Sequence, residues 1–172
     1  MKPEMLDALN KQINAEIYSS YLYFAMAAYC DDNRLPGFAN WMRCQAQEEL
    51  FHAAKFYKYI NERGGRVTMS PIDGPPNDWK DPLEVFKNVL SHEQHVTELI
   101  SNLVDLSLQL KDFTAHQMLD WFVGEQVEEE DTARGIIDSL ELVKGDGRGM
   151  LMLDRELAQR TFVAPPLYGA GA

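Results

Sequence analysis

The stretch Gln47-Glu48-Glu49-Leu50-Phe51-His52-Ala53 decides the fold of this chain. It lies in a segment from about Phe38 to Arg63 whose apolar residues recur with the period of a helix. Glu49 and His52 occupy positions on the apolar face of that helix, where core residues are expected. Residues three apart lie on one helix face, so this carboxylate and this imidazole can bind the same ion.

Three further segments have helical period: from about Glu4 to Asp32, from about Pro82 to the break at Lys111-Asp112, and from about Phe113 to Val143. Short connections join the first segment to the second and the third to the fourth, which predicts two antiparallel pairs. The connector from Gly64 to Asp81 is rich in proline and can reach about 55 Å. A helix of 26 residues is about 39 Å long, so the connector can run the length of a bundle.

The sequence therefore predicts an all-α four-helix bundle with one long crossover. Arg148 to Arg160 is expected to form a short fifth helix. Its apolar residues Leu151, Leu153 and Leu157 are expected to be buried only in an oligomer. We expect one domain over residues 1–162 and a flexible C-terminal tail over residues 163–172.

Each of the other long helices also places a carboxylate on its apolar seam: Glu16, Glu93 and Glu129. Counted from the turns at Leu35 and Lys111, the polar seam residues lie at similar depths, within about 7–8 Å of one another. Glutamate side chains can close such a gap. We therefore expect a single layer of polar side chains, which comprises Glu16, Glu49, His52, Glu93 and Glu129.

Four buried carboxylates would repel one another, and burying each ion costs several kcal/mol. No Lys or Arg lies on these seams, so either the glutamates are protonated or metal cations compensate them. Mixed carboxylate and imidazole ligands suit iron or manganese, whereas a closed zinc site would favour thiolates.

The overall charge narrows the class of function. The net charge of −11 argues against a nucleic-acid partner and favours attraction of cations. The chain has no apolar run long enough to span a membrane and its N-terminus does not resemble a signal peptide. With only two cysteines, a cytoplasmic location is expected.

Three stretches carry a resemblance to a known family: Asn14-Ala15-Glu16-Ile17-Tyr18-Ser19-Ser20-Tyr21-Leu22-Tyr23, the stretch from Gln47 to Ala53, and Glu125-Gln126-Val127-Glu128-Glu129-Glu130. Over residues 4–162 the chain resembles the prokaryotic non-haem ferritins. The resemblance implies the ferritin-like form of the four-helix bundle and a ferroxidase centre with two irons.

The resemblance also implies roles for single residues. Glu16, Glu49 and His52 would hold one iron. A second iron would be held by Glu49, Glu93 and Glu129, with Gln126 close by, and Tyr23 would hydrogen-bond near the centre. A third iron would use Glu48, Glu125, Glu128 and Glu129. The chain differs from the bacterioferritins, which have a second Glu-x-x-His where this chain has Gln126-x-x-Glu129. No haem is expected, because Leu50 stands where they supply a methionine to haem.

The implied function is oxidation of Fe(II) by O₂ or H₂O₂ and storage of the product inside a homo-oligomeric shell, usually of 24 subunits. One alternative is a di-iron oxidase or oxygenase that acts on another substrate, which would need a substrate pocket beside the metals. Another is a helical bundle for signalling or binding, which would not explain five polar residues in one layer.

Overall fold

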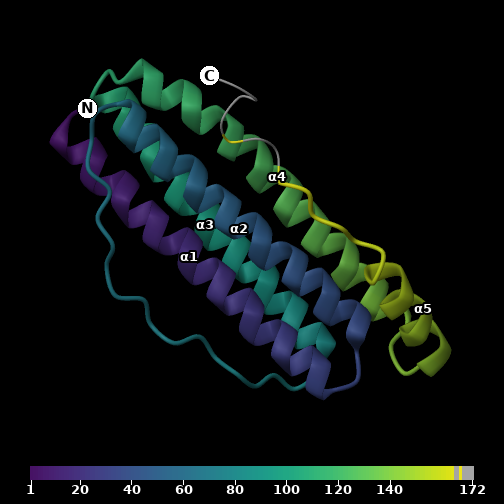
Figure 1. Cartoon of the computed structure of the whole chain (residues 1–172). Coiled ribbons are helices and arrows are strands. Elements are labelled where there is room, and N and C mark those ends of the chain that lie inside the picture. The colour runs from purple at the N-terminus through teal and green to yellow at the C-terminus, as the bar shows by residue number, and fades with distance from the viewer. Residues whose placement is uncertain (165–166, 168–172) are drawn as a thin grey trace. The chain divides into compact units, whose positions relative to one another are not determined.

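The computed structural model describes residues 1–164 and residue 167. Within these residues the chain is helical and contains no strand (Figure 1). The helices are α1 (Pro3–Asp32), α2 (Pro36–Glu62), α3 (Pro82–Gln109), α4 (Phe113–Leu142) and α5 (Gly147–Leu157). The predicted helices are therefore confirmed. The predicted tail, residues 163–172, lies mostly outside the described residues.

The chain forms two compact units. Among the described residues, the first consists of residues 1, 6–78, 151–164 and 167, and contains most of α1, all of α2 and most of α5. The second consists of residues 2–5 and 79–150, and contains α3 and α4.

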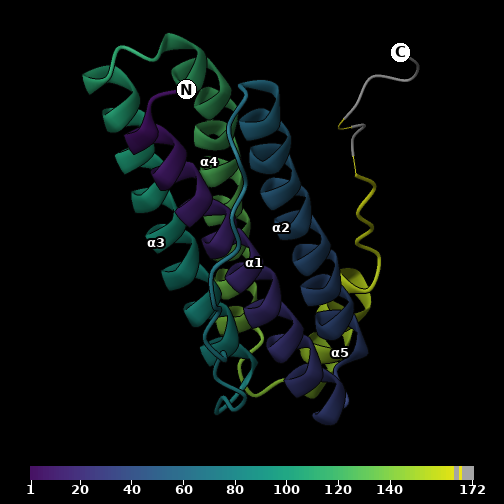
Figure 2. The ribbon, with the colours of Figure 1, turned by 60° about the vertical axis from the view of Figure 1, so that its left-hand side comes forward.

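In the first unit α1 and α2 form an antiparallel hairpin, side by side in Figures 1 and 2. Arg34 turns the chain with a φ of 61°, and Pro36 then starts α2, where a missing N–H is tolerated. Across the hairpin, Ser20 Oγ donates a hydrogen bond to the Ala46 carbonyl at 2.8 Å. Nearer the turn, the Tyr23 ring packs edge-on against Trp41 with 6.3 Å between centroids.

The connector after α2 runs back along α1. Gly64, with a φ of 68°, ends the helix. Asn10 on α1 then fixes the connector by two hydrogen bonds: its Nδ2 donates to the Arg66 carbonyl and its Oδ1 accepts from the Thr68 N–H. Further along, Asn14 Nδ2 donates to the Pro71 carbonyl at 3.3 Å. The connector thus advances in the same direction as α1, as the predicted crossover requires.

α5 packs at the start of α2 (Figure 2). Asp154 Oδ1 accepts hydrogen bonds from the N–H groups of Gly37 and Phe38, at 2.8 and 3.1 Å. The local cap residue of α2, a leucine, gives no side-chain hydrogen bond, so this distant carboxylate takes over the capping. Leu153 and Leu157 are buried in the single chain. The prediction that they are buried only in an oligomer is therefore wrong, because α5 docks on α2; Leu151 stays half exposed.

The second unit is the α3–α4 hairpin. Asp81 caps α3 by accepting a hydrogen bond from the Glu84 N–H at 2.8 Å, with Pro82 as the first helical residue. Asp112 caps α4 in the same way through the Ala115 N–H. Of the helices that the structure describes, none is both long and apolar enough to cross a membrane.

Candidate metal centre

The first unit gathers Glu16 from α1 with Glu49 and His52 from α2. Each side chain offers one ligand atom, and these atoms lie within 4.8 Å of one another. His52 Nδ1 lies 3.5 Å from Glu49 Oε2 and 3.9 Å from Glu16 Oε2. All three side chains are at most 2% exposed. The three residues therefore form a buried cluster of two carboxylates and one imidazole.

The electrostatics of this cluster favour a cation. Burial, and after it the neighbouring Glu49 carboxylate, raise the pKa of Glu16 from 4.5 to about 8. His52 and a hydrogen bond from Gln12 act in the opposite direction. Glu16 Oε2 is buried and has no hydrogen-bond partner among the described residues. A bound metal ion would supply both the missing partner and the missing positive charge, so these residues fit a metal.

Two glutamines support the two carboxylates from one helical turn earlier. On α1, Gln12 Nε2 donates to Glu16 Oε1 at 2.8 Å, and on α2, Gln45 Nε2 donates to Glu49 Oε1 at 3.4 Å. Both glutamines are buried. Neutral amides therefore orient both carboxylates without adding charge.

The second unit holds the other predicted residues. Glu93 on α3 and Gln126 and Glu129 on α4 are all buried. Gln126 Nε2 lies 3.2 Å from Glu93 Oε2 and 3.2 Å from the Glu93 carbonyl oxygen. The α3–α4 hairpin thus presents its own buried pair of carboxylates with a neutral amide on one of them.

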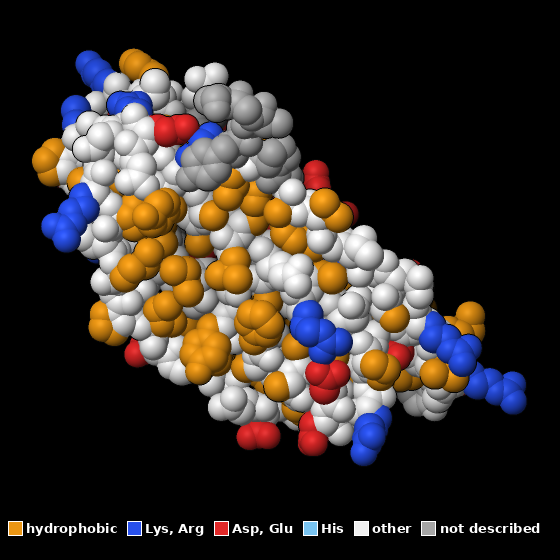
Figure 3. All heavy atoms as spheres, viewed as in Figure 1, with side chains coloured by type: hydrophobic (Ala, Val, Ile, Leu, Met, Phe, Trp, Pro, Cys, Tyr) orange, Lys and Arg blue, Asp and Glu red, His pale blue; other side chains and the backbone are white. Residues whose placement is uncertain are grey.

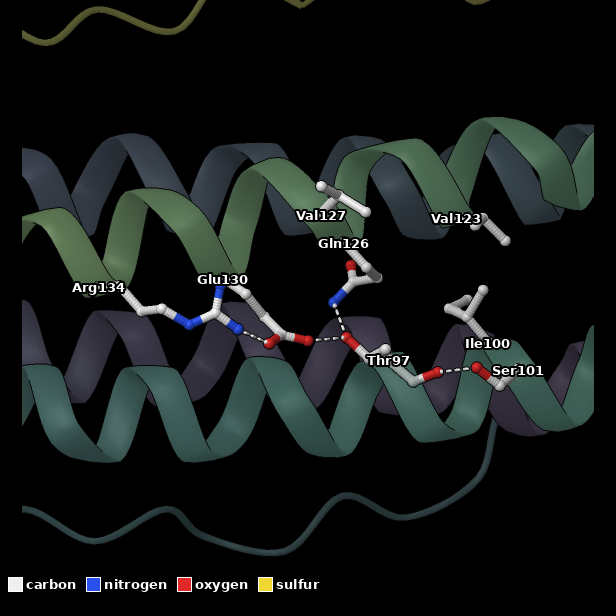
Figure 4. A pocket seen from close by; sticks show the side chains of 8 residues that line it. All are labelled: Thr97, Ile100, Ser101, Val123, Gln126, Val127, Glu130 and Arg134. Carbon is white, nitrogen blue, oxygen red and sulfur yellow. Dashed lines mark hydrogen bonds and ion pairs between the residues drawn. The ribbon is translucent and has the colours of Figure 1, made fainter.

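A hydrogen-bond chain leads from Gln126 to the surface of this hairpin (Figure 4). Gln126 Nε2 donates to Thr97 Oγ1 at 3.4 Å, and Thr97 Oγ1 donates to Glu130 Oε1 at 2.7 Å. Glu130 is in turn paired with Arg134, one turn further along α4. These hydrogen-bonded residues line a pocket of about 210 Å³. Its other lining residues are Ile100, Ser101, Val123 and Val127.

The residues proposed for a third iron lie in different surroundings. Glu48 is bonded to an arginine, with Arg160 Nη2 2.7 Å from Glu48 Oε2. Glu125 is half-buried and Glu128 is exposed. Tyr23 is fully buried.

Comparison with known proteins identifies the family. The family model for the ferritin-like domain matches residues 6–143. The chain belongs to the ferritin family. It is 43% identical over 162 residues to a bacterial non-haem ferritin of Staphylococcus saprophyticus, covering 94% of this chain and 97% of the relative. A ferritin of the same description from Staphylococcus aureus is 41% identical and 98% covered.

Solved ferritin structures agree. An open pore ferritin from the archaeon Archaeoglobus fulgidus matches with a TM-score of 0.93 and 49% identity, over 94% of this chain and 99% of that one. An engineered closed form of the Archaeoglobus fulgidus ferritin matches with a TM-score of 0.94 and 48% identity, over 95% of this chain and 99% of that one. The predicted ferritin-like bundle with a long crossover and a short fifth helix is confirmed, and iron storage is the function of this ferritin.

Several supporting residues were not predicted. Gln12 could have been found, because it is a polar residue on the apolar stripe of α1, one turn before Glu16. Asp154 and Arg160 could not, since each has the appearance of ordinary surface charge near the end of the chain. Their partners lie more than a hundred residues away.

Proposed function

We propose that the protein is a ferroxidase that oxidises Fe(II) at a paired site and stores the ferric product inside a homo-oligomeric shell. The observation that carries this proposal is the buried cluster of Glu16, Glu49 and His52. Its burial raises the pKa of Glu16 and leaves one carboxylate oxygen without a hydrogen-bond partner among the described residues. Membership in the ferritin family supports iron as the ion for this cluster.

The ligand sets follow the sequence prediction. Glu16, Glu49 and His52 would bind one Fe(II). Glu49, Glu93 and Glu129 would bind the second, with Glu49 as the bridge. Burial of all five supports this assignment, and so does the bond from Gln126 to Glu93. Oxygen and imidazole ligands suit iron in this mixed set.

The reaction needs two electrons. Each Fe(II) gives up one, and O₂ takes up both with two protons to become H₂O₂. When H₂O₂ is the oxidant, it takes up two electrons and two protons to give two water molecules. Two adjacent ions deliver both electrons together and thereby avoid release of a one-electron oxygen radical. The role of the protein is to hold the two substrate ions side by side, and the amides of Gln12, Gln45 and Gln126 keep the carboxylates aimed.

A third iron would bind beside the pair, at Glu48, Glu125, Glu128 and Glu129. Exposure of Glu128 and partial exposure of Glu125 support a site that solvent reaches. A divalent ion there would be bound less tightly than the buried pair, because water competes with these carboxylates for the ion.

Assembly into a shell would cover apolar surface. Tyr21 and Phe24 on α1 and Leu50 and Tyr57 on α2 are exposed. Figure 3 shows hydrophobic side chains gathered on the face over these helices. Such a patch is typical of a subunit interface. We propose a homo-oligomer of 24 subunits in the cytoplasm, in which the net charge of −11 on each chain attracts Fe(II).

Aerobic iron oxidation by the assembled protein tests this function. Fe(II) is added in air, and ferric absorbance is followed together with particle mass. We expect fast oxidation, more than two irons retained per chain, and a large particle. The substitutions Glu49→Ala and His52→Ala should abolish the fast phase.

A matched control lies on α3, where His95 and Glu98 have the same spacing of three residues but are exposed. His95→Ala and Glu98→Ala should leave the fast phase intact. Unchanged fast oxidation in Glu49→Ala would overturn the site. A small particle that retains at most two irons per chain would overturn the storage function.

A further inference from the structure

The C-terminal segment after α5 is fastened along one face of α2. Asn40 Nδ2 donates a hydrogen bond to the carbonyl of Arg160 at 2.9 Å, and Cys44 Sγ donates to the same carbonyl at 3.4 Å. Further along α2, the Phe162 ring packs edge-on against Phe51 with centroids 6.3 Å apart. The backbone of Arg160 is therefore held at a fixed place on α2, which lets its side chain act with precision.

The Arg160 side chain ends on Glu48. Its Nη2 lies 2.7 Å from Glu48 Oε2, and its guanidinium carbon lies 4.4 Å from the centroid of the Trp41 ring. The two charged side chains are only 23% and 20% exposed. A charge-assisted hydrogen bond in such partial burial, together with stacking on an indole, is stronger than an ordinary surface ion pair.

This attachment is made through one nitrogen. The other terminal nitrogen, Nη1, is buried and has no hydrogen-bond partner within the part of the chain that the structure describes. A bidentate fork, the usual strong geometry of arginine on a carboxylate, would engage both nitrogens. Arg160 therefore neutralises Glu48 by a single contact that a more highly charged cation can displace.

We infer that Arg160 is a tethered counter-ion that competes with metal for Glu48 and so sets how readily a third ion binds. This inference rests on the third iron site in the proposed function. The guanidinium and a divalent ion cannot both take Glu48 Oε2, and their like charges repel at this distance. A third ion therefore binds Glu48 tightly only after the guanidinium withdraws from it, while the buried pair of ions binds without this competition.

Calorimetric titration of the metal-free full chain with Zn²⁺, which is redox-inert, tests the inference. We expect two tightly bound ions per chain and one weaker ion. Arg160→Gln should raise the affinity for the weaker ion roughly tenfold and leave the affinity for the tight ions unchanged. Arg155→Gln, which removes an exposed arginine of α5, is the matched control and should change neither class.

A double substitution identifies the carboxylate. Adding Glu48→Gln to Arg160→Gln should remove the gained affinity. If Arg160→Gln binds the tight ions but its affinity for the weaker ion is unchanged, the inference is overturned and the proposed paired site is not. Absence of the tight ions from the unsubstituted protein would instead overturn the proposed paired site.

Fluorescence gives a second reading that does not depend on the Arg160→Gln protein folding. With Trp79 and Trp121 replaced by Phe, the emission comes from Trp41, whose ring lies under the Arg160 guanidinium. We expect this emission to change over the Zn²⁺ range of the weaker ion, as the guanidinium withdraws. Emission that stays constant over that range would show that Arg160 does not move, which contradicts the inference.

Discussion

Gln12 Nε2 lies 2.8 Å from Glu16 Oε1, one turn away on α1, and both side chains are buried. The amide is a neutral donor, so it stabilises the ionised carboxylate without placing a positive charge near an incoming cation. Gln45 has the same relation to Glu49 on α2. The two helices thus support their metal-binding carboxylates by the same device.

Gln12→Leu should weaken the binding of Fe(II) at the first site roughly three- to tenfold, because Glu16 loses a hydrogen bond to its charged form. The side chains have similar volumes, so packing is preserved. The measurement is an anaerobic equilibrium titration with Fe(II). Gln94→Leu, at an exposed position of α3, is the control and should have no effect. Equal affinities in the two variants would show that the Gln12 amide is dispensable.

The metal-free protein should lose stability as the pH rises. Burial and the Glu49 carboxylate raise the pKa of Glu16 from 4.5 to about 8, so the fold favours the protonated form. This contribution is fully present below pH 4.5 and is lost as the pH rises through about 8. We expect the midpoint temperature of thermal unfolding to decrease as the pH is raised from about 5 to about 9. In Glu16→Gln this decrease should be smaller. A fall of the same size in Glu16→Gln would assign it to other groups.

The sequence predicted the parts of the site that rest on local spacing. Glu49 and His52 lie three apart on one helix, and Pro82 with Asp81 marks the start of α3; both relations need only the helical period and a cap. Counting residues from a turn predicted a similar depth for each glutamate, and all four are buried in the structure.

The long-range contacts were beyond such reasoning. Asp154 caps α2 from 117 residues away, and Arg160 reaches Glu48 across 112 residues. On sequence alone each is one more charge on a polar helix face. Leu153 shows the same limit, because its apolar side chain predicted burial but did not show that the single chain already buries it.

Asp154→Ala should lower the free energy of unfolding by about 1–2 kcal/mol, since two N–H groups at the start of α2 lose their acceptor. Asp154→Asn keeps an acceptor oxygen and should cost less. Urea unfolding of the metal-free protein measures both. Asp138→Ala, at an exposed position of α4, is the control. Unfolding curves that coincide for Asp154→Ala and the control would show that the cap contributes nothing.

Gly37→Ala should displace α5 from α2. A Cβ at this position would lie 1.6 Å from the backbone carbonyl oxygen of Asp154, which cannot yield as a flexible side chain can. We expect faster proteolysis within α5 together with lower stability than in Asp154→Ala. Gly135→Ala, at an open position of α4, should be tolerated. A Gly37→Ala protein as stable as the unsubstituted chain would contradict the close approach of α5.

Thr97→Val should selectively weaken the binding of the second Fe(II) ion. The Thr97 hydroxyl accepts from Gln126 Nε2 and donates to Glu130 Oε1, so it fixes the orientation of the Gln126 amide (Figure 4). Valine has nearly the same shape but offers neither bond. The Gln126 amide would then depend on its two 3.2 Å contacts with Glu93, to Oε2 and to the carbonyl oxygen, and would be held less firmly. The loss of one such bond corresponds to roughly a three- to tenfold weaker second step in an anaerobic Fe(II) titration.

Thr97→Ser retains the hydroxyl and should bind both ions normally. If Thr97→Val and Thr97→Ser bind the second ion equally well, the hydroxyl does not position Gln126.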